Sequence, residues 1–140
     1  MNMTLICMPT VDNGGLLSSI PIHLEKAPCF TLIKLEKWKI KEINVIKGTG
    51  KHIDDYKVFT KFIEDLNVDV VICGCLGEQY KLILYENSVE VFSGEFGKVK
   101  DVFNEWRLGF YQLQMKNSVK MVVKNHEEEL NENSHNFNRA

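Results

Sequence analysis

Two side chains in this sequence, the imidazole of His23 and the thiol of Cys75, are of the kinds that bind iron, copper and zinc. The spacing between His23 and Cys75 matches no zinc-finger pattern or other metal signature. A shared metal site therefore depends on the fold to bring the two residues together. His52 and Cys29 are further candidate ligands for such a site.

Cys73 and Cys75 flank Gly74 at the end of an apolar run. Because Gly74 marks the end of the predicted strand, we expect Cys73 to be a buried core residue and Cys75 to lie in the following loop. A loop thiol beside a helix N-terminus favours the thiolate, which is the form that binds metals. A structural role for Cys75 stays equally open, whereas Cys7 and Cys29 are expected to be core residues.

Two glycine-containing loops are candidate ligand-binding segments. Residues 74–77, Gly-Cys-Leu-Gly, offer backbone N–H groups at a predicted helix start, which favours anionic ligands, but they lack the spacing of a phosphate-binding P-loop. Residues 11–19 include Asp12 and Gly14 and have the composition of a turn-rich loop. An alternative interpretation is that glycines such as Gly14, Gly74 and Gly77 only form turns.

Hydrophobic patterning predicts an alternation of strands and helices around these loops. A first strand over residues 4–8 is expected to stop at Pro9, and Glu36 with Lys37 is expected to form a tight hairpin. The predicted strands cover residues 4–8, 29–35, 38–46, 68–73 and 89–92. The predicted helices cover residues 53–66, residues 78–85 and a final segment, with Val99, Val102, Phe103 and Trp106 on one face, that ends near Gly109.

This order of elements predicts an α/β fold with a five-stranded mixed sheet and helices on both faces. The first three strands form an antiparallel meander, and right-handed crossovers make the fourth and fifth strands parallel to the first. Only the second strand is therefore antiparallel to the others, in a ribonuclease-H-like strand order. The carboxyl ends of the parallel strands bring residues 12–23, 48–52, 73–77 and 94–97 to one edge, where ligands bind in open α/β sheets.

Composition narrows the classes of protein that fit the chain. Apolar residues make up 44% of the chain, and 17 basic residues against 19 acidic ones give a net charge of -2, which disfavours nucleic-acid binding. No apolar run approaches the roughly 20 residues of a membrane span, and no signal peptide is evident, so we expect a cytoplasmic protein with reduced thiols. Residues 1–112 are expected to form one domain and residues 113–140 a polar extension, disordered from about residue 124.

Catalytic patterns are weak. The sequence contains neither a G-x-S-x-G nucleophile elbow nor a C-x-x-C dithiol pair. A two-metal nuclease of ribonuclease-H-like fold needs a carboxylate in the first strand, and residues 4–8 contain none. These observations favour a binding protein over an enzyme.

The candidate loops carry a recognisable motif. Asp-Asn-Gly-Gly at residues 12–15, a following serine and His-Leu-Glu-Lys-Ala-Pro-Cys-Phe at residues 23–30 resemble the D-x-x-G, S, H-F-G-R-A-P-x-F signature of the dinitrogenase iron-molybdenum cofactor biosynthesis domain. Residues 68–77 resemble its G-V-D-V-V-I-x-G-G-x-G segment. The resemblance spans about residues 4–109 and implies a five-stranded mixed sheet of ribonuclease-H-like order.

The resemblance also implies a function in carrying nitrogenase cofactor or its iron-sulfur precursors. His23 matches the motif histidine that binds clusters in some carriers, and residues 74–77 match the glycine loop. The sequence departs from the pattern at residues 24–26, where Leu-Glu-Lys replaces Phe-Gly-Arg and places an acid beside the expected site. Cys75 replaces a common glycine of the pattern and adds a candidate ligand of this protein's own.

Three hypotheses follow. The leading one is a small cytoplasmic carrier of an iron-sulfur or iron-molybdenum-type cluster or its precursor, which works with a protein partner in cluster assembly. A metal-free regulatory module that binds a protein partner through its polar tail, or a small anion, is the alternative, and a hydrolase dependent on Asp12 or His23 is the third. In the leading hypothesis His23 and Cys75 are the metal ligands, and the remaining binding residues are Asp12, Gly14, Gly74 and Gly77.

Overall fold

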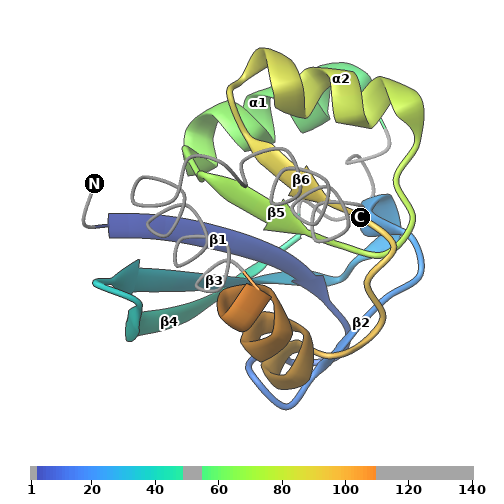
Figure 1. The fold of residues 1–140 in the computed structure, drawn as a ribbon. Coiled ribbons are helices and arrows are strands. Elements are labelled where there is room, and N and C mark those ends of the chain that lie inside the picture. Colours follow the sequence, from blue (N-terminus) through green and yellow to red (C-terminus); the bar gives the residue numbers. More distant parts are fainter. Residues whose placement is uncertain (1–2, 49–54, 110–140) are drawn as a thin grey trace, which may run out of the picture.

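The computed structural model describes residues 3–48 and 55–109 of the chain. A five-stranded sheet in the order β4-β3-β1-β5-β6 forms its centre (Figure 1). The strands of this sheet are β1 (Met3–Thr10), β3 (Cys29–Glu36), β4 (Lys39–Lys47), β5 (Val70–Ile72) and β6 (Glu90–Phe92).

Strand directions agree with the sequence-based topology. β3 is antiparallel to both of its neighbours, β1 and β4, whereas β5 is parallel to β1 and β6 is parallel to β5. The predicted mixed sheet with an antiparallel second strand is therefore confirmed. A second, two-stranded sheet, which the sequence did not predict, pairs β2 (Ser19–Ile20) with β7 (Gly97–Lys98) in antiparallel orientation.

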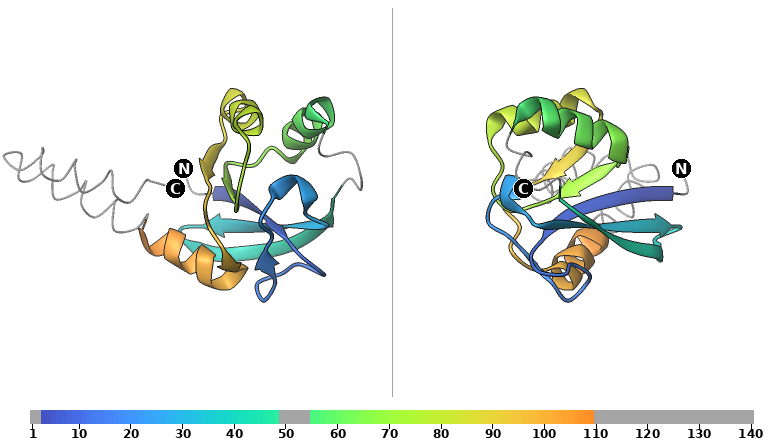
Figure 2. Two further views of the ribbon diagram at one scale, coloured as in Figure 1. Left: turned by 90° about the vertical axis from the view of Figure 1, so that its right-hand side faces the viewer. Right: turned by 180° about the vertical axis from the view of Figure 1, so that it is seen from behind.

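Helices cover both faces of the central sheet, as expected from the crossover connections. α1 (Tyr56–Leu66) and α2 (Glu78–Glu86) lie on one face, and a helix over residues 99–109 lies on the other (Figure 2). A short 3-10 helix, η1 (Leu24–Lys26), precedes β3. Each face has its own apolar core, because successive side chains of a strand point to opposite sides.

The alternation is clear in β1. Cys7 belongs to the core under α1 and α2, and its neighbours Ile6 and Met8 belong to the core under the helix 99–109. On the α1 and α2 side the rings of Phe59 and Tyr80 meet edge to face with centroids 4.9 Å apart. Burial of these side chains supplies the main favourable contribution to folding.

Helix α1 begins at a side-chain cap. The carboxylate of Asp55 accepts hydrogen bonds from the backbone N–H groups of Lys57 and Val58. Asp55 was expected within the first turn of a helix that began at residue 53, but it is the residue before the first turn. Its oxygen satisfies N–H groups that lack partners within the helix, which is why the helix begins here.

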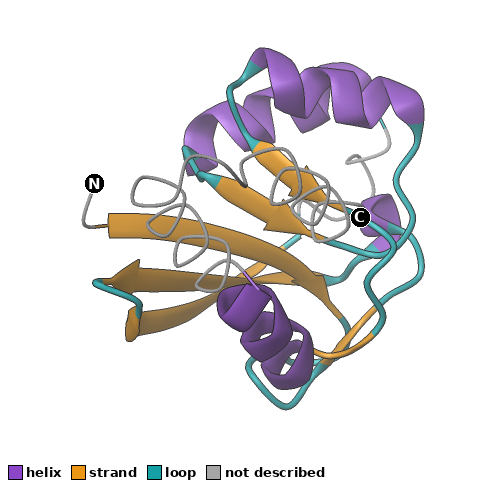
Figure 3. Cartoon of the chain, viewed as in Figure 1, coloured by secondary structure: helices purple, strands orange, loops and turns teal. Residues whose placement is uncertain are grey.

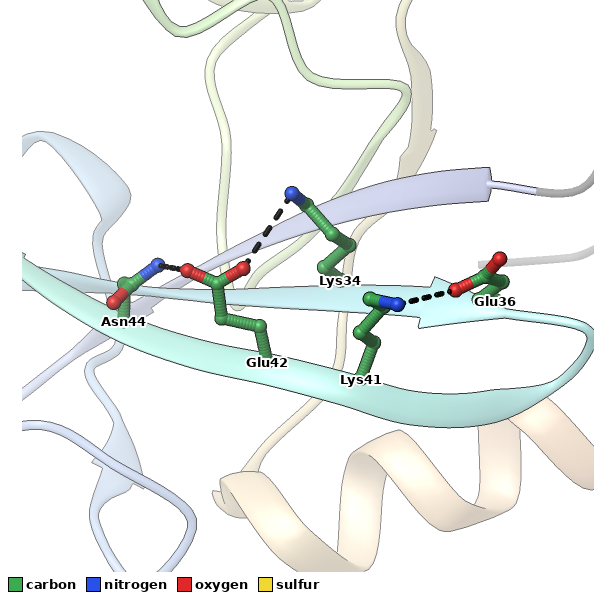
Figure 4. Close-up of polar contacts among 5 residues, drawn as sticks. All are labelled: Lys34, Glu36, Lys41, Glu42 and Asn44. Atoms are coloured by element: carbon green, nitrogen blue, oxygen red, sulfur yellow. Dashed lines mark hydrogen bonds and ion pairs between the residues drawn. The ribbon is translucent and has the colours of Figure 1, made fainter.

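The β3–β4 hairpin carries a polar outer surface. Lys34 lies 3.5 Å from Glu42, and Lys41 lies 2.9 Å from Glu36 (Figure 4). Asn44 donates a 2.8 Å hydrogen bond to Glu42 and, with the nearby Lys34, lowers the pKa of that carboxyl. These ion pairs are exposed and contribute little stability, but opposite charges across the strands favour the observed register.

Two local predictions were wrong. Pro9 does not end β1, which continues to Thr10. The N–H of Leu5 donates to the carboxylate of Asp69, and its carbonyl accepts from the N–H of Asp69, so the backbone groups of Leu5 face the β5 side. Every second residue of a strand faces the same neighbour, so the nitrogen of Pro9 also faces that side. β5 pairs with β1 only at Ile6 and Cys7, so no N–H is needed from the proline.

The hairpin turn is displaced by one residue from its predicted position. Its two central residues are Lys37 and Trp38, with φ of 54° and 70°, and not Glu36 and Lys37. Positive φ at both positions matches the twist of the flanking strands, which compensates for the cost of this backbone conformation.

Several sequence predictions lie outside the described residues. These are His52, the start of the predicted helix at residue 53 and the polar extension over residues 113–140. No helix in the described part of the chain is both long and apolar enough to cross a membrane.

Candidate functional site

The central feature of the candidate site is a direct backbone pairing between the two predicted metal ligands. His23 and Cys75 form a parallel β-bridge, and the N–H of Cys75 donates a 2.6 Å hydrogen bond to the carbonyl of Ile22. Neighbouring chains in such a pairing lie about 4.8 Å apart, and paired residues direct their side chains to the same face. The fold therefore makes His23 and Cys75 backbone neighbours with their side chains directed to the same face.

Gly74 allows this close approach. A Cβ atom at Gly74 would lie 2.7 Å from the carbonyl oxygens of both Pro21 and Ile22 and 3.0 Å from the ring of Phe96. These oxygens belong to the backbone and cannot rotate away as a side chain can. Only glycine fits here without displacing the segment that carries His23.

The loop after β6 completes the arrangement. The N–H of Gly94 donates to the carbonyl of Gly74 at 2.8 Å, and the N–H of Glu95 donates to the carbonyl of Cys73 at 3.0 Å. The connections that follow β1, β5 and β6 thus meet at the carboxyl edge of the sheet, as predicted (Figure 3). The loop that carries Cys75 is held on both sides by backbone hydrogen bonds.

The two candidate ligands are accessible. His23 and Cys75 are exposed, whereas Leu24, next to His23, is buried in the core under α1 and α2. Ile22 and Phe96, which flank the pairing, are 61% and 54% exposed despite their apolar side chains. Neither residue was predicted as part of the site. Ile22 lies among the apolar residues Ile20, Pro21 and Leu24, a pattern that predicts burial.

The other three cysteines are buried, as predicted. Burial raises the pKa of Cys73 from 9.0 to about 12, with Lys81 opposing the shift and Cys75 adding to it. Burial likewise raises the pKa of Cys7 far above its usual value. The thiols of Cys7 and Cys73 therefore stay protonated and are poor ligands, which leaves Cys75 as the accessible sulfur at this edge.

Glu25 contributes a buried acidic atom close to this edge. Its Oε1 is inaccessible to solvent and has no hydrogen-bond partner among the described residues. The carboxyl group is close enough to raise the pKa of Cys73 electrostatically. Glu25 is the acid that replaces glycine in the family motif, so the departure seen in the sequence falls beside the candidate site.

Asp12 and Gly14 lie in the loop after β1, next to the start of β3. A Cβ at Gly14 would lie 2.7 Å from Cγ1 of Val45 and 3.2 Å from Sγ of Cys29. The Cys29 thiol contacts the backbone carbonyl oxygen of Asp12 at 3.3 Å. Cys29 is thus buried within the turn, where its thiol helps to hold the loop.

Gly77 is the residue before the first turn of α2, with an ordinary φ of -69°. Its carbonyl accepts the N–H of Lys81 at 3.0 Å, which is the first hydrogen bond of the helix. The structure therefore brings His23, Gly74 and Cys75 into direct backbone contact. Gly77 lies two residues further along the same loop. Asp12 and Gly14 lie beside Cys29.

His23 and Cys75 offer two donor atoms of kinds that bind transition metals. Imidazole nitrogen and thiolate sulfur together bind zinc, iron and copper. Among residues 3–48 and 55–109, no group of three or more histidine, cysteine, aspartate or glutamate residues is arranged to hold a metal ion. The described part of one chain thus offers a pair of donors at this edge.

Comparison with solved structures shows a shared fold. The chain resembles the crystal structure of PH0822 with a TM-score of 0.68 and 19% identity, over 76% of this chain and 92% of that one. It resembles the apo form of the orange protein from Desulfovibrio gigas with a TM-score of 0.58 and 16% identity, over 76% and 89% of the two chains. It also resembles the solution structure of a putative dinitrogenase, MJ0327, from Methanococcus jannaschii, with a TM-score of 0.58 and 19% identity, over 78% of this chain and 91% of that one.

Comparison of the sequence with curated proteins and with family profiles shows which family the chain belongs to. No curated protein matches the chain. The family profile described as dinitrogenase iron-molybdenum cofactor matches residues 5–109, which include all strands except the first two residues of β1, all the described helices and the His23–Cys75 pairing. The match covers most of the chain and agrees with the motif residues and the fold. The chain therefore belongs to the dinitrogenase iron-molybdenum cofactor family.

Proposed function

We propose that this protein is a cytoplasmic carrier that binds an iron-sulfur or iron-molybdenum-type cluster, or a precursor of one, as cargo. The imidazole of His23 and the thiolate of Cys75 are the metal ligands. The protein acts by binding and not by catalysing a reaction, and it delivers its cargo to a protein partner in cluster assembly.

The observation that carries this proposal is the β-bridge between His23 and Cys75. Because the backbones that carry the nitrogen and sulfur donors are already paired, metal binding needs to order only the two side chains. Membership of a family named after the iron-molybdenum cofactor supports a metal cluster as the ligand. The name of the family does not specify the cluster, and the donor pair itself suits several.

Exposure of the donors favours transfer of the cargo. Both side chains are open to solvent, and the segments that carry them are fixed by backbone hydrogen bonds. A cluster held by two protein ligands keeps other coordination positions for ligands from a partner. Exchange can then proceed one bond at a time without unfolding the carrier.

Anaerobic reconstitution with ferrous iron and sulfide tests the proposal. The full chain is expected to acquire visible absorption that both His23→Ala and Cys75→Ser weaken. Glu64→Gln is the matched control, because Glu64 is also exposed but lies in α1 and outside the proposed binding residues. A chain that stays colourless, or spectra unchanged in both ligand variants, would reject cluster binding and favour a metal-free interaction module.

A further inference from the structure

We propose that the outer edge of β4 is a docking surface for residues 118–124 of the same chain, which add a strand to the central sheet there. This segment reads Ser-Val-Lys-Met-Val-Val-Lys and lies outside the described residues. The surface contains neither His23 nor Cys75. The inference is therefore independent of the proposed carrier function.

β4 is an outer strand of the five-stranded sheet. Within residues 3–48 and 55–109 it pairs only with β3, from Lys39 to Lys47. Alternate backbone N–H and C=O groups of such a strand point away from the sheet and can bond to another extended segment. Natural proteins usually cover or disrupt a long edge of this kind, because it can otherwise pair with other molecules.

A row of apolar side chains runs along one face of β4. Ile40 and Ile43 pair with Leu35 and Ile33, two buried residues of β3, and Val45 follows on the same face. Ile40 and Val45 are nevertheless 36% and 43% exposed. A further strand beside β4 would cover the outer side of this row, which is favourable for apolar groups.

The proposed strand has two faces that match those of β4. Its alternate residues form an apolar set and a set that contains two lysines, namely Val119, Met121 and Val123 against Lys120, Val122 and Lys124. The apolar set fits beside the apolar row of β4. The lysines then lie on the opposite face of the sheet, where β4 carries the exposed carboxylate of Glu42.

The described part of the chain ends close to β4. Nη1 of Arg107 donates a 3.1 Å hydrogen bond to the backbone carbonyl of Trp38, in the turn that precedes β4. The helix 99–109 therefore ends beside the β3–β4 hairpin. Residues 110–117 can span up to about 29 Å when extended, and a strand of the length of β4 is about 30 Å long. The segment can thus reach most of the β4 edge.

Charge favours an antiparallel orientation of the added strand. Residues 127–129, Glu-Glu-Glu, follow it in the sequence. In an antiparallel arrangement these acids approach the hairpin turn, where Lys37 and Lys39 are exposed. Antiparallel pairing of β4 with β4 of a second copy about Ile43 would instead place Lys39 opposite Lys47, which disfavours a second copy as the occupant.

Nuclear magnetic resonance of the full chain tests this inference. We expect close contacts between α-protons of residues 118–124 and 39–47, as antiparallel neighbours make, in a protein with the mass of a monomer by light scattering. The β4 amides that point away from β3 should also be protected from hydrogen exchange. Absence of these contacts would overturn the inference. Contacts found only in a dimer would also overturn it, because the occupant would then be a second copy.

Proline variants of the full chain give a second test. N–H groups of successive residues point to opposite sides of a strand, so either Lys120→Pro or Met121→Pro removes a donor to β4. In at least one of the two, the outward β4 amides should exchange at least about tenfold faster. Ser134→Pro lies beyond the proposed strand and is the matched control, with unchanged exchange expected.

The outcomes separate this inference from the proposed function. Unchanged exchange in both Lys120→Pro and Met121→Pro would overturn the added strand and leave the carrier proposal intact. The iron and sulfide reconstitution depends on His23 and Cys75, which none of these variants alters. A colourless protein would therefore reject the carrier proposal without affecting the strand.

Discussion

His23 and Cys75 are neighbours across a parallel β-bridge although one precedes β3 and the other follows β5. The bridge extends the sheet beyond its regular strands and uses the carbonyl of Ile22 as acceptor for the N–H of Cys75. The backbone positions that carry the imidazole and the thiol are therefore held next to each other by main-chain pairing.

The bridge should depend on the absence of a side chain at Gly74. Gly74→Ala places a Cβ 2.7 Å from two backbone oxygens, and we expect it to lower the free energy of unfolding by about 1–3 kcal/mol. The amide of Cys75, which donates to Ile22, should lose protection from hydrogen exchange. Nuclear magnetic resonance of the amide signals measures this loss directly.

Gly77→Ala is the matched control for Gly74→Ala. Gly77 has φ of -69°, and its added Cβ would meet Tyr80 at an ordinary 3.6 Å. We expect a cost of at most about 1 kcal/mol from the changed helix cap, with the Cys75 amide still protected. Equal loss of protection in both variants would show that the close contact at Gly74 does not hold the bridge.

The four cysteines should differ sharply in reactivity. All four lie in the described part of the chain, and only Cys75 is exposed there. We expect one equivalent of iodoacetamide to modify the native protein rapidly, and the other three thiols to react only on unfolding. Peptide mass spectrometry identifies the labelled residue, and rapid labelling should disappear in Cys75→Ser. Rapid labelling of Cys73 or Cys29 in the native protein would contradict the described burial.

Stability should fall in alkaline solution because of the buried thiols. Cys73 has its pKa raised by burial from 9.0 to about 12, so the unfolded chain releases this proton at lower pH than the folded chain. The stabilisation is fully present below about pH 9 and is lost as the pH rises toward 12, at up to about 1.4 kcal/mol per pH unit. Cys7 should add a loss in the same direction.

Urea unfolding at a series of pH values measures this effect. Cys73→Ala removes the titrating group, so its free energy of unfolding should fall less steeply above about pH 9 than that of the unmodified protein. The comparison between the two proteins cancels the contribution of the groups that they share. Parallel curves would indicate that Cys73 has the same pKa in the folded and unfolded chains.

The loop after β1 should tolerate a side chain at Gly15 better than at Gly14. Both residues have positive φ, 93° and 73°, so each alanine carries a backbone cost of about 1–2 kcal/mol. A Cβ at Gly14 would also contact Val45 at 2.7 Å and Thr31 at 3.1 Å, whereas nothing lies within 4 Å at Gly15. Thermal unfolding should therefore show a larger loss for Gly14→Ala.

A second substitution checks the cause of that difference. Val45→Ala in the Gly14→Ala background removes the closest contacting atom and should recover part of the lost stability. If Gly14→Ala and Gly15→Ala are equally destabilising, the effect comes from backbone conformation and the contact with β4 is unimportant.

The sequence predicted the central sheet because its signals are local. Apolar runs bounded by glycine and turn residues identified β1, β3, β5 and β6, and the handedness of crossover connections then fixed their directions. The end of β1 escaped prediction because the effect of Pro9 depends on which neighbour its nitrogen faces. Asp55 was predicted in the first turn of α1 and is its cap, because the same local sequence allows either position.

The pairing of the short strands β2 and β7 could not be predicted from the local sequence. Ser19–Ile20 and Gly97–Lys98 are two residues each, too short to give a periodic pattern, and they form a sheet only because the loops that contain them meet in space. The exposure of Ile22 and Phe96 has the same origin, since burial depends on which segments pack above a residue.

For the candidate site, the sequence by itself determined the chemistry, namely one imidazole, one loop thiol and glycines at the ends of strands. It also determined the family through the motif residues, which the profile match over residues 5–109 confirms. Only the tertiary structure decided that His23 pairs with Cys75, while Asp12 and Gly14 lie beside Cys29. The reason is physical: residue types and spacing fix local conformation, but a contact between distant loops depends on the packing of the elements that carry them.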